Sequence, residues 1–210
     1  MQRTALAFHD AGGTKVEAIA GGQSCWRFRP HFHAGDEVVR ILAGRARLRL
    51  GSSSAELGQG DTIVVPAGAI HRFEPVDEKG WAFSSEFMPR PAQAQGQGCS
   101  DAESDGLVRQ VKLLLAERPA LRTQVEAIAK ACAVSSGHLA RTFRRATGTG
   151  LHNFQVLLAV RKAKALLQEG APPAEAALDG GFYDQAHLNR EFVRTFGMTP
   201  GTFRSAWAAH

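Results

Sequence analysis

The chain has 210 residues, enough for one large domain or two small ones, and its 44% hydrophobic content is ordinary for a protein with an apolar core. It opens with no charged-then-apolar leader and holds no apolar run of membrane length, so we expect a cytoplasmic protein with no membrane partner. Three cysteines, an odd number without metal-type spacing, indicate reduced thiols rather than a disulfide framework.

The net charge of +5 is unevenly distributed along the chain. Residues 1–104 hold 11 Lys and Arg against 12 Asp and Glu, a balance of −1, and residues 105–210 hold 14 against 8, a balance of +6. A basic half beside a neutral half predicts a nucleic-acid-binding domain attached to a second domain.

Residues 25–87 are punctuated like an all-β unit, with short runs of Val, Ile, Leu and Phe broken by Gly, Pro and Asp. The runs V-V-R-I-L-A and R-A-R-L-R-L flank Gly44, which predicts a hairpin there. In the second run Arg45, Arg47 and Arg49 alternate with apolar residues. We therefore expect the arginines to form a row on the solvent face of a strand.

Four metal-type ligands lie within this unit. His31 and His33 are two residues apart, so on a strand both imidazoles project from the same face. The carboxylate of Glu37 and a third imidazole at His71 would complete a site of three nitrogens and one oxygen. Such a site suits a divalent transition metal, namely Zn, Fe, Mn, Ni or Cu.

The two segments that carry these ligands resemble the paired motifs of the cupin superfamily. The first reads H-F-H-A-G-D-E, and the second keeps the spacing G-x5-P-x-G-x2-H up to His71. The departures are Cys25, where the motif usually has Gly, and Pro75, where it usually has Asn. The resemblance implies a double-stranded β-helix barrel, which we expect over residues 1–88, as a sensor or ligand-binding domain.

Residues 89–104 separate this barrel from a helical half. The segment loses all apolar periodicity, and its Pro, Gln and Gly content predicts a flexible linker. From residue 105 to residue 210 the apolar spacing is helical, and we expect an all-α domain with two helix-turn-helix motifs.

The first predicted motif ends in a helix that follows Ser135 or Ser136 as N-cap and stops before Gly148. Its buried positions are Leu139 and Phe143. The opposite face shows polar groups that we expect to meet DNA: His138 and Arg141 for base edges, Arg144 and Arg145 for phosphates or solvent. The next helix, Leu151 to Gln168, is about 27 Å long, which suits two recognition helices about one DNA turn apart.

The second predicted motif lies between Gly181 and Pro200. Asp184 stands at the N-cap position before apolar residues at helical spacing, which are Leu188, Phe192 and Phe196. The opposite face carries hydrogen-bonding and cationic groups of the kind that read base edges and contact phosphates: Gln185, His187, Asn189, Arg190 and Arg194.

The pattern G-F-x-D-Q-x-H-x-x-R-x-F-x-x-x-F-G-x-T-P resembles the second helix-turn-helix of the AraC family of bacterial transcription regulators. Two mild departures are Ala186 for a common Ser and Leu188 for a common Phe, and Ala159 stands where the family usually carries Arg. The resemblance implies a regulator, activator or repressor, whose partners are double-stranded DNA and a small-molecule effector or metal. The short linker leaves little room for dimerising helices, so the sequence does not decide whether the protein forms a homodimer.

Three interpretations of the barrel compete. In regulators of this type the histidines often contact an organic effector without metal, and His31, His33, Glu37 and His71 could do the same. A metal-dependent cupin enzyme fused to a DNA-binding module would need an acid or base as well, for which Glu86 and Arg72 are candidates. The third is a purely structural barrel. We expect a regulator and no enzyme, with aromatic residues inside the barrel: Trp26, Phe28, Phe73, Trp81 and Phe83.

Overall fold

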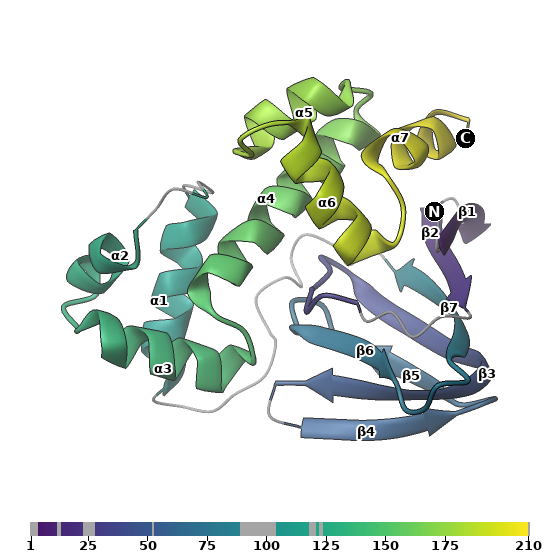
Figure 1. Cartoon of the computed structure of the whole chain (residues 1–210), viewed down its shortest axis with the longest axis horizontal. Helices are drawn as coiled ribbons and strands as arrows, with labels where there is room; N and C mark the ends of the chain where they lie inside the picture. Colours follow the sequence, from purple (N-terminus) through teal and green to yellow (C-terminus); the bar gives the residue numbers. More distant parts are fainter. Residues whose placement is uncertain are drawn as a thin grey trace. The chain divides into compact units, whose positions relative to one another are not determined.

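The computed structural model describes residues 4–11, 14–22, 28–51, 53–88, 104–117, 121 and 124–209 (Figure 1). The chain divides into two compact units. One comprises Met1–Gly98 together with Val193–His210, and the other comprises Cys99–Phe192. The predicted linker over residues 89–104 lies outside the described residues except for Ser104, which begins a helix.

The first unit contains an antiparallel sheet in which β3 is the central strand. The order of strands is β1-β2-β7-β3-β4, with β5 and β6 also pairing with β3. The strands are β1 Thr4–Ala11, β2 Thr14–Gly22, β3 Asp36–Leu50, β4 Ser53–Gly58, β5 Thr62–Val65, β6 His71–Pro75 and β7 Trp81–Met88. This arrangement agrees with the expected cupin-like barrel.

The hairpin expected at Gly44 is wrong. β3 runs without a turn through this position for 15 residues, pairing with β5 and β7 along its first half and with β4 and β6 along its second. Gly44 instead follows a register shift between Ile41 and Ala43, and its φ is +71°. A side chain here would meet the carbonyl oxygen of Gly80, so glycine lets one strand bend between two partners.

The arginine row on β3 lies at the surface, as expected, and each arginine has an acidic partner. Arg45 pairs with Asp77 at 3.3 Å, and Arg47 pairs with Glu56 at 2.5 Å. Arg49 contacts the buried carboxylate of Glu74 at 2.7 Å, and Arg72 contacts the same group at 3.3 Å. The Arg45 and Arg47 pairs are solvent-exposed and each contributes little to stability. Together the pairs neutralise one face of the sheet.

Residues 193–210 belong to the first unit and contain the end of α6 and all of α7, Pro200–Ala208. The Thr4 hydroxyl donates to the carbonyl of Phe196 at 2.5 Å, and Trp207 meets the ring of Phe8 edge-on at 4.8 Å. Phe203 is fully buried, and its ring stacks with that of Phe196 at a centroid distance of 6.5 Å.

The second unit is helical. Its helices are α1 Ser104–Glu117, α2 Val125–Ala131, α3 Ser136–Thr147, α4 Leu151–Gln168, α5 Pro173–Gly180 and most of α6 Gln185–Phe196. The predicted bounds of α4 are confirmed, and Figure 1 shows this helix running between the α2–α3 pair and the α5–α6 pair. Of the two serines offered as N-cap of α3, Ser135 is the cap, because its hydroxyl accepts from the His138 N–H at 3.2 Å.

In the parts of the chain that the structure describes, no helix is both long enough and apolar enough to span a membrane. Of the cysteines, only Cys132 lies among the described residues. It carries a free thiol, and burial raises the pKa of that thiol above its usual value.

Candidate metal centre and nucleic-acid interface

The four predicted ligands come together in the first unit. The ligand atoms of His31, His33, Glu37 and His71 all lie within 4.8 Å of one another, and three of the four residues are buried. Three imidazole nitrogens and one carboxylate oxygen are a donor set for a divalent transition metal. The residues present therefore fit such an ion.

The route by which the ligands converge differs from the prediction, because His31 and His33 do not share a regular strand. They lie in the irregular segment before β3, and His31 forms an isolated antiparallel bridge with His71 at the start of β6. Glu37 follows as the second residue of β3. The imidazoles of His31 and His33 still point the same way, with ring centroids 4.9 Å apart.

Backbone carbonyls fix the tautomers of two ligands. Nδ1 of His31 lies 2.8 Å from the carbonyl oxygen of Arg29, and Nδ1 of His71 lies 2.9 Å from that of Ala69. Because a carbonyl oxygen only accepts, each Nδ1 carries the ring proton and donates it. The Nε2 atoms are then left with lone pairs for an ion, which is the usual role of such outer contacts at metal-binding histidines.

Glu37 supplies the negative charge of the cluster. Its Oε2 lies 2.8 Å from Nε2 of His71 and 3.4 Å from Nε2 of His33. Burial by itself would raise the pKa of Glu37, but the charge and hydrogen bond of His33, with those of His71, outweigh it and hold the pKa well below the usual value. With Nδ1 of His71 already protonated, a carboxylate oxygen faces a lone pair at 2.8 Å, and either a second proton or a cation must separate them.

His31 is kept neutral by its surroundings. Burial lowers the pKa of its imidazole well below the usual value, and the neighbouring His71 and His33 lower it further. A neutral imidazole is the form that coordinates a metal, because protonation occupies the lone pair. Burial therefore holds His31 in the form that can coordinate a metal.

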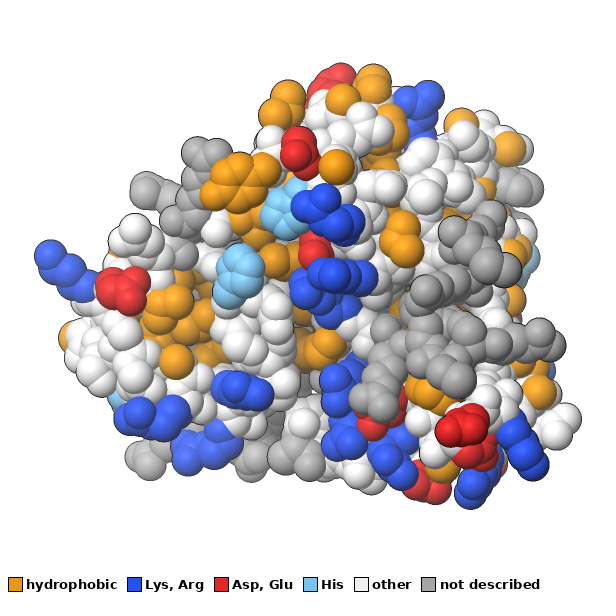
Figure 2. All heavy atoms as spheres, in the orientation of Figure 1, with side chains coloured by type: hydrophobic (Ala, Val, Ile, Leu, Met, Phe, Trp, Pro, Cys, Tyr) orange, Lys and Arg blue, Asp and Glu red, His pale blue; other side chains and the backbone are white. Residues whose placement is uncertain are grey.

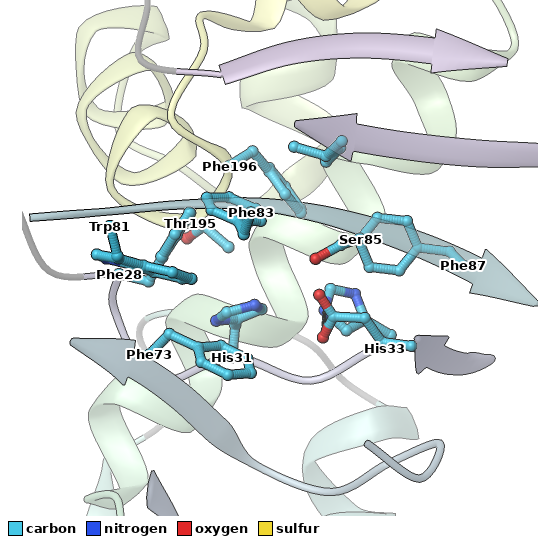
Figure 3. A pocket seen from close by; sticks show the side chains of 12 residues that line it. Phe28, His31, His33, Phe73, Trp81, Phe83, Ser85, Phe87, Thr195 and Phe196 are labelled. Atoms are coloured by element: carbon cyan, nitrogen blue, oxygen red, sulfur yellow. Dashed lines mark ion pairs between the residues drawn. The ribbon is translucent and has the colours of Figure 1, made fainter. Parts of the chain in front are cut away.

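A cavity adjoins the predicted ligands, and His31, His33 and Glu37 form part of its wall. Figure 3 shows His31 and His33 directed into it between aromatic rings. Four of the five aromatic residues expected inside the barrel line this cavity, and the fifth, Trp26, lies outside the described residues. The full lining is Ile19, Phe28, His31, His33, Glu37, Phe73, Trp81, Phe83, Ser85, Phe87, Thr195 and Phe196.

Sequence reasoning missed Ser85 and Phe87 as cavity residues. The spacing of residues along β7 could have identified them. Residues 81, 83, 85 and 87 are every second residue of the strand, so their side chains point to the same face. The two residues proposed as an acid or base, Glu86 and Arg72, are not in the lining; Glu86 is exposed and Arg72 pairs with Glu74.

The first predicted DNA-contact surface lies on α3. Leu139 and Phe143 are fully buried. The predicted contact residues all lie on the exposed side of the helix: His138, Arg141, Arg144 and Arg145. Ser135 caps the helix and Gly148 ends it in the left-handed conformation at φ +70°, so both predicted ends are confirmed.

The second surface lies on α6. Leu188, Phe192 and Phe196 are buried, and Asp184 caps the helix by accepting from the His187 N–H at 2.6 Å. Four of the predicted contact residues are exposed and His187 is half-buried; the exposed ones are Gln185, Asn189, Arg190 and Arg194. Figure 2 shows basic and histidine side chains gathered on the face that carries α3 and α6.

Two regions of the chain match known domain families. Residues 128–206 match the helix-turn-helix domain family, and residues 16–80 match the cupin domain family. The cupin match contains the four clustered ligands, and the helix-turn-helix match contains every predicted DNA contact.

Two curated relatives match part of the chain. The HTH-type transcriptional regulator GlxA of Rhizobium meliloti (strain 1021) is 39% identical over 89 residues, which are 42% of this chain and 26% of the relative. The bifunctional transcriptional activator/DNA repair enzyme Ada of Escherichia coli (strain K12) is 28% identical over 124 residues, 59% of this chain and 34% of the relative. The chain thus spans about a quarter to a third of these two relatives.

One solved structure resembles the chain over both domains. ToxT from Vibrio cholerae O395, bound to (E)-4-(8-methylnaphthalen-1-yl)but-3-enoic acid, aligns with 91% of this chain and 99% of its own, with a TM-score of 0.57 and 9% identity. At that identity the likeness is one of fold. The likeness extends over nearly the whole of both chains.

Proposed function

We propose that this protein is a transcription regulator that binds a specific DNA sequence through α3 and α6 and whose cupin domain binds a divalent transition metal. The observation that carries the metal assignment is the convergence of three imidazole nitrogens and one carboxylate oxygen within 4.8 Å of one another. Nδ1 of His31 and Nδ1 of His71 each face a backbone carbonyl oxygen, and Nε2 of His71 lies 2.8 Å from Oε2 of Glu37. When bound, the ion would supply a positive charge and coordination positions for a small ligand.

The alternative signal is an organic effector held by the same four residues. The name of the ToxT structure includes an organic acid, so a protein of this fold can hold one. In the present chain the cavity is lined by aromatic rings as well as by His31, His33 and Glu37, so it offers apolar contacts to such a ligand too. The donor set of three imidazole nitrogens and one carboxylate oxygen favours the metal.

The proposal assigns no reaction to the cupin domain. The two side chains that could have acted as acid or base, Glu86 and Arg72, lie outside the cavity lining. Turnover would therefore have to use the cluster itself. The DNA-binding assignment stands on α3 and α6 and is independent of how the cluster is used.

One experiment tests both parts of the proposal. The full chain is purified without chelator, its metal content is measured, and an operator is selected from a random duplex library. Operator affinity is then compared before and after chelation and after adding back Zn, Fe, Mn, Ni or Cu singly. We expect near-stoichiometric metal and an affinity that changes with loading. A metal-free protein whose operator affinity responds to an organic acid would instead make the four residues effector contacts.

A further inference from the structure

Tyr183 has a large exposed side chain at the entrance of the second recognition helix. It directly precedes the N-cap Asp184, and 68% of its surface is exposed. An aromatic residue one position before an N-cap usually packs against the fourth helical residue, which here is Leu188. Leu188 is fully buried while Tyr183 is exposed, so this packing does not explain Tyr183.

The ring of Tyr183 contacts a predicted DNA-reading residue instead. Its centroid lies 6.1 Å from that of His187, with an interplanar angle of 29°. The buried Phe182 also contacts His187, with ring centroids 5.2 Å apart and an interplanar angle of 89°. The imidazole therefore contacts one ring that is nearly parallel to it and one that is nearly perpendicular, both typical aromatic geometries.

The position of His187 on the helix makes this contact relevant to DNA. Its N–H donates to Asp184 Oδ1 at 2.6 Å, which places His187 in the first turn of α6. In helix-turn-helix proteins the first turns of the recognition helix reach base edges in the major groove. A ring already held in one orientation loses less side-chain entropy when it binds.

The first motif offers an internal comparison. His138 occupies the same place on α3, with its N–H donating to the capping Ser135 hydroxyl at 3.2 Å. The residue before that cap is Val134, and among the described residues no aromatic ring packs on His138. Two histidines thus stand at equivalent helical positions, and only the one on α6 is held by rings.

We propose that Tyr183 is a positioning residue for DNA recognition, which orients the imidazole of His187 towards a base edge in the major groove. The inference rests on the proposed DNA-binding function and adds a residue outside the exposed face of α6. Tyr183 acts through its flat ring, so its hydroxyl is dispensable. Its effect must then disappear when His187 is removed.

The test is a double-mutant cycle in the full chain. The probes are an operator duplex that the wild type selects from a random library and a scrambled duplex of the same composition. The variants are Tyr183→Ala, Tyr183→Phe, His187→Ala and Tyr183→Ala with His187→Ala. Leu178→Ala is the matched control, because Leu178 on α5 is also 68% exposed. Tyr183→Leu keeps apolar bulk without a flat ring, and replaces Tyr183→Ala if that variant loses helicity.

We expect Tyr183→Ala and Tyr183→Leu to weaken operator binding about three- to tenfold and to leave binding to scrambled DNA unchanged, the range expected for an aromatic pair. Tyr183→Phe and Leu178→Ala should stay within twofold of the wild type. In the His187→Ala background the substitution of Tyr183 should have no further effect. Additive losses, equal losses on scrambled DNA, or a Tyr183→Phe defect as large as that of Tyr183→Ala would each overturn the proposal. Failure of the wild type to select any operator would overturn the DNA-binding function with it, whereas an operator insensitive to Tyr183 would overturn this inference alone.

Discussion

His31 and His71 are joined through their backbones by two hydrogen bonds. The His31 N–H donates to the carbonyl of His71 at 2.8 Å, and the His71 N–H donates to the carbonyl of His31 at 2.9 Å. Their ring centroids lie 4.5 Å apart. The main chain therefore sets the separation of these two predicted ligands without an ion, which would lower the ordering cost of metal binding.

Removing His71 should abolish metal binding. We expect His71→Ala to lose both the retained metal and the rise in melting temperature that added metal gives the wild type, since binding to the folded state alone stabilises it by about 2.7 kcal/mol at a hundredfold excess over Kd. His9→Ala on the exposed part of β1 is the control for a lost histidine. The measurements are the metal content and the melting temperature of both variants, with and without added metal. Stoichiometric metal that persists in a His33→Ala, His71→Ala double variant would refute this ligand set.

The metal-free protein should lose stability in mild acid. The folded pKa of His31 is depressed, so below pH of about 6.5 the unfolded chain binds a proton that the folded chain does not. Stability is then lost as pH falls from that value towards the folded pKa, by at most about 1.4 kcal/mol per pH unit for this one group. Glu37, whose folded pKa is also lowered, adds a loss in the same direction at lower pH.

Urea unfolding at several pH values in chelating buffer measures this dependence. A His31→Gln variant should show a flatter dependence between pH 6.5 and 5, because the titrating group is gone. If the wild type and the variant keep the same slope, the acid sensitivity comes from other groups.

Gly44→Ala should destabilise the cupin domain strongly. The new methyl group would meet the Gly80 carbonyl, and φ at this position is +71°. Strain of this kind costs about 1–3 kcal/mol, with the steric clash in addition. Gly51→Ala is the matched control, since its φ is +56° but no atom lies within 4 Å of the added methyl. Equal losses of unfolding free energy in the two variants would show that the approach to Gly80 has no cost.

Arg190→Ala should reduce specific binding far more than non-specific binding. An arginine early on a recognition helix can donate two hydrogen bonds to a guanine, worth about 1–3 kcal/mol of discrimination. Arg145→Ala, near the end of α3, should instead weaken both kinds of binding and lower the log–log salt slope by about one unit, as a phosphate contact does. Titrations of operator and scrambled duplexes at several salt concentrations separate these behaviours. An Arg190→Ala variant that loses affinity equally on both duplexes would reassign Arg190 to the backbone.

Local signals in the sequence predicted the helical part of the fold well. Asp184 and Ser135 cap α6 and α3 because their side chains compete for the first free N–H groups, and that chemistry is visible in a few adjacent residues. The bounds of α4 followed from apolar spacing alone. By contrast, Gly44 suggested a turn, and only a contact with Gly80, 36 positions away in sequence, explains why it sits inside a strand.

The sequence predicted which residues form the candidate sites, but it did not predict how they are arranged in space. The cupin-type spacing named all four ligands, but it could not show that His31 bridges to His71, because that pairing depends on two segments about 40 residues apart meeting. Alternation along β7 would have added Ser85 and Phe87 to the cavity. The contact between Tyr183 and His187 needs ring orientations, which no residue pattern specifies.

β3 carries Glu37 near one end and Arg45, Arg47 and Arg49 near the other. Because successive side chains of a strand point to opposite faces, a slip of one residue in its pairing would turn Glu37 out of the cavity and at the same time turn the arginines into the core. The ligand cluster and the charged face are therefore correct together or wrong together. An ion that binds only the completed cluster would stabilise chains in which β3 is paired in the correct register, and it would leave chains with a shifted register unstabilised.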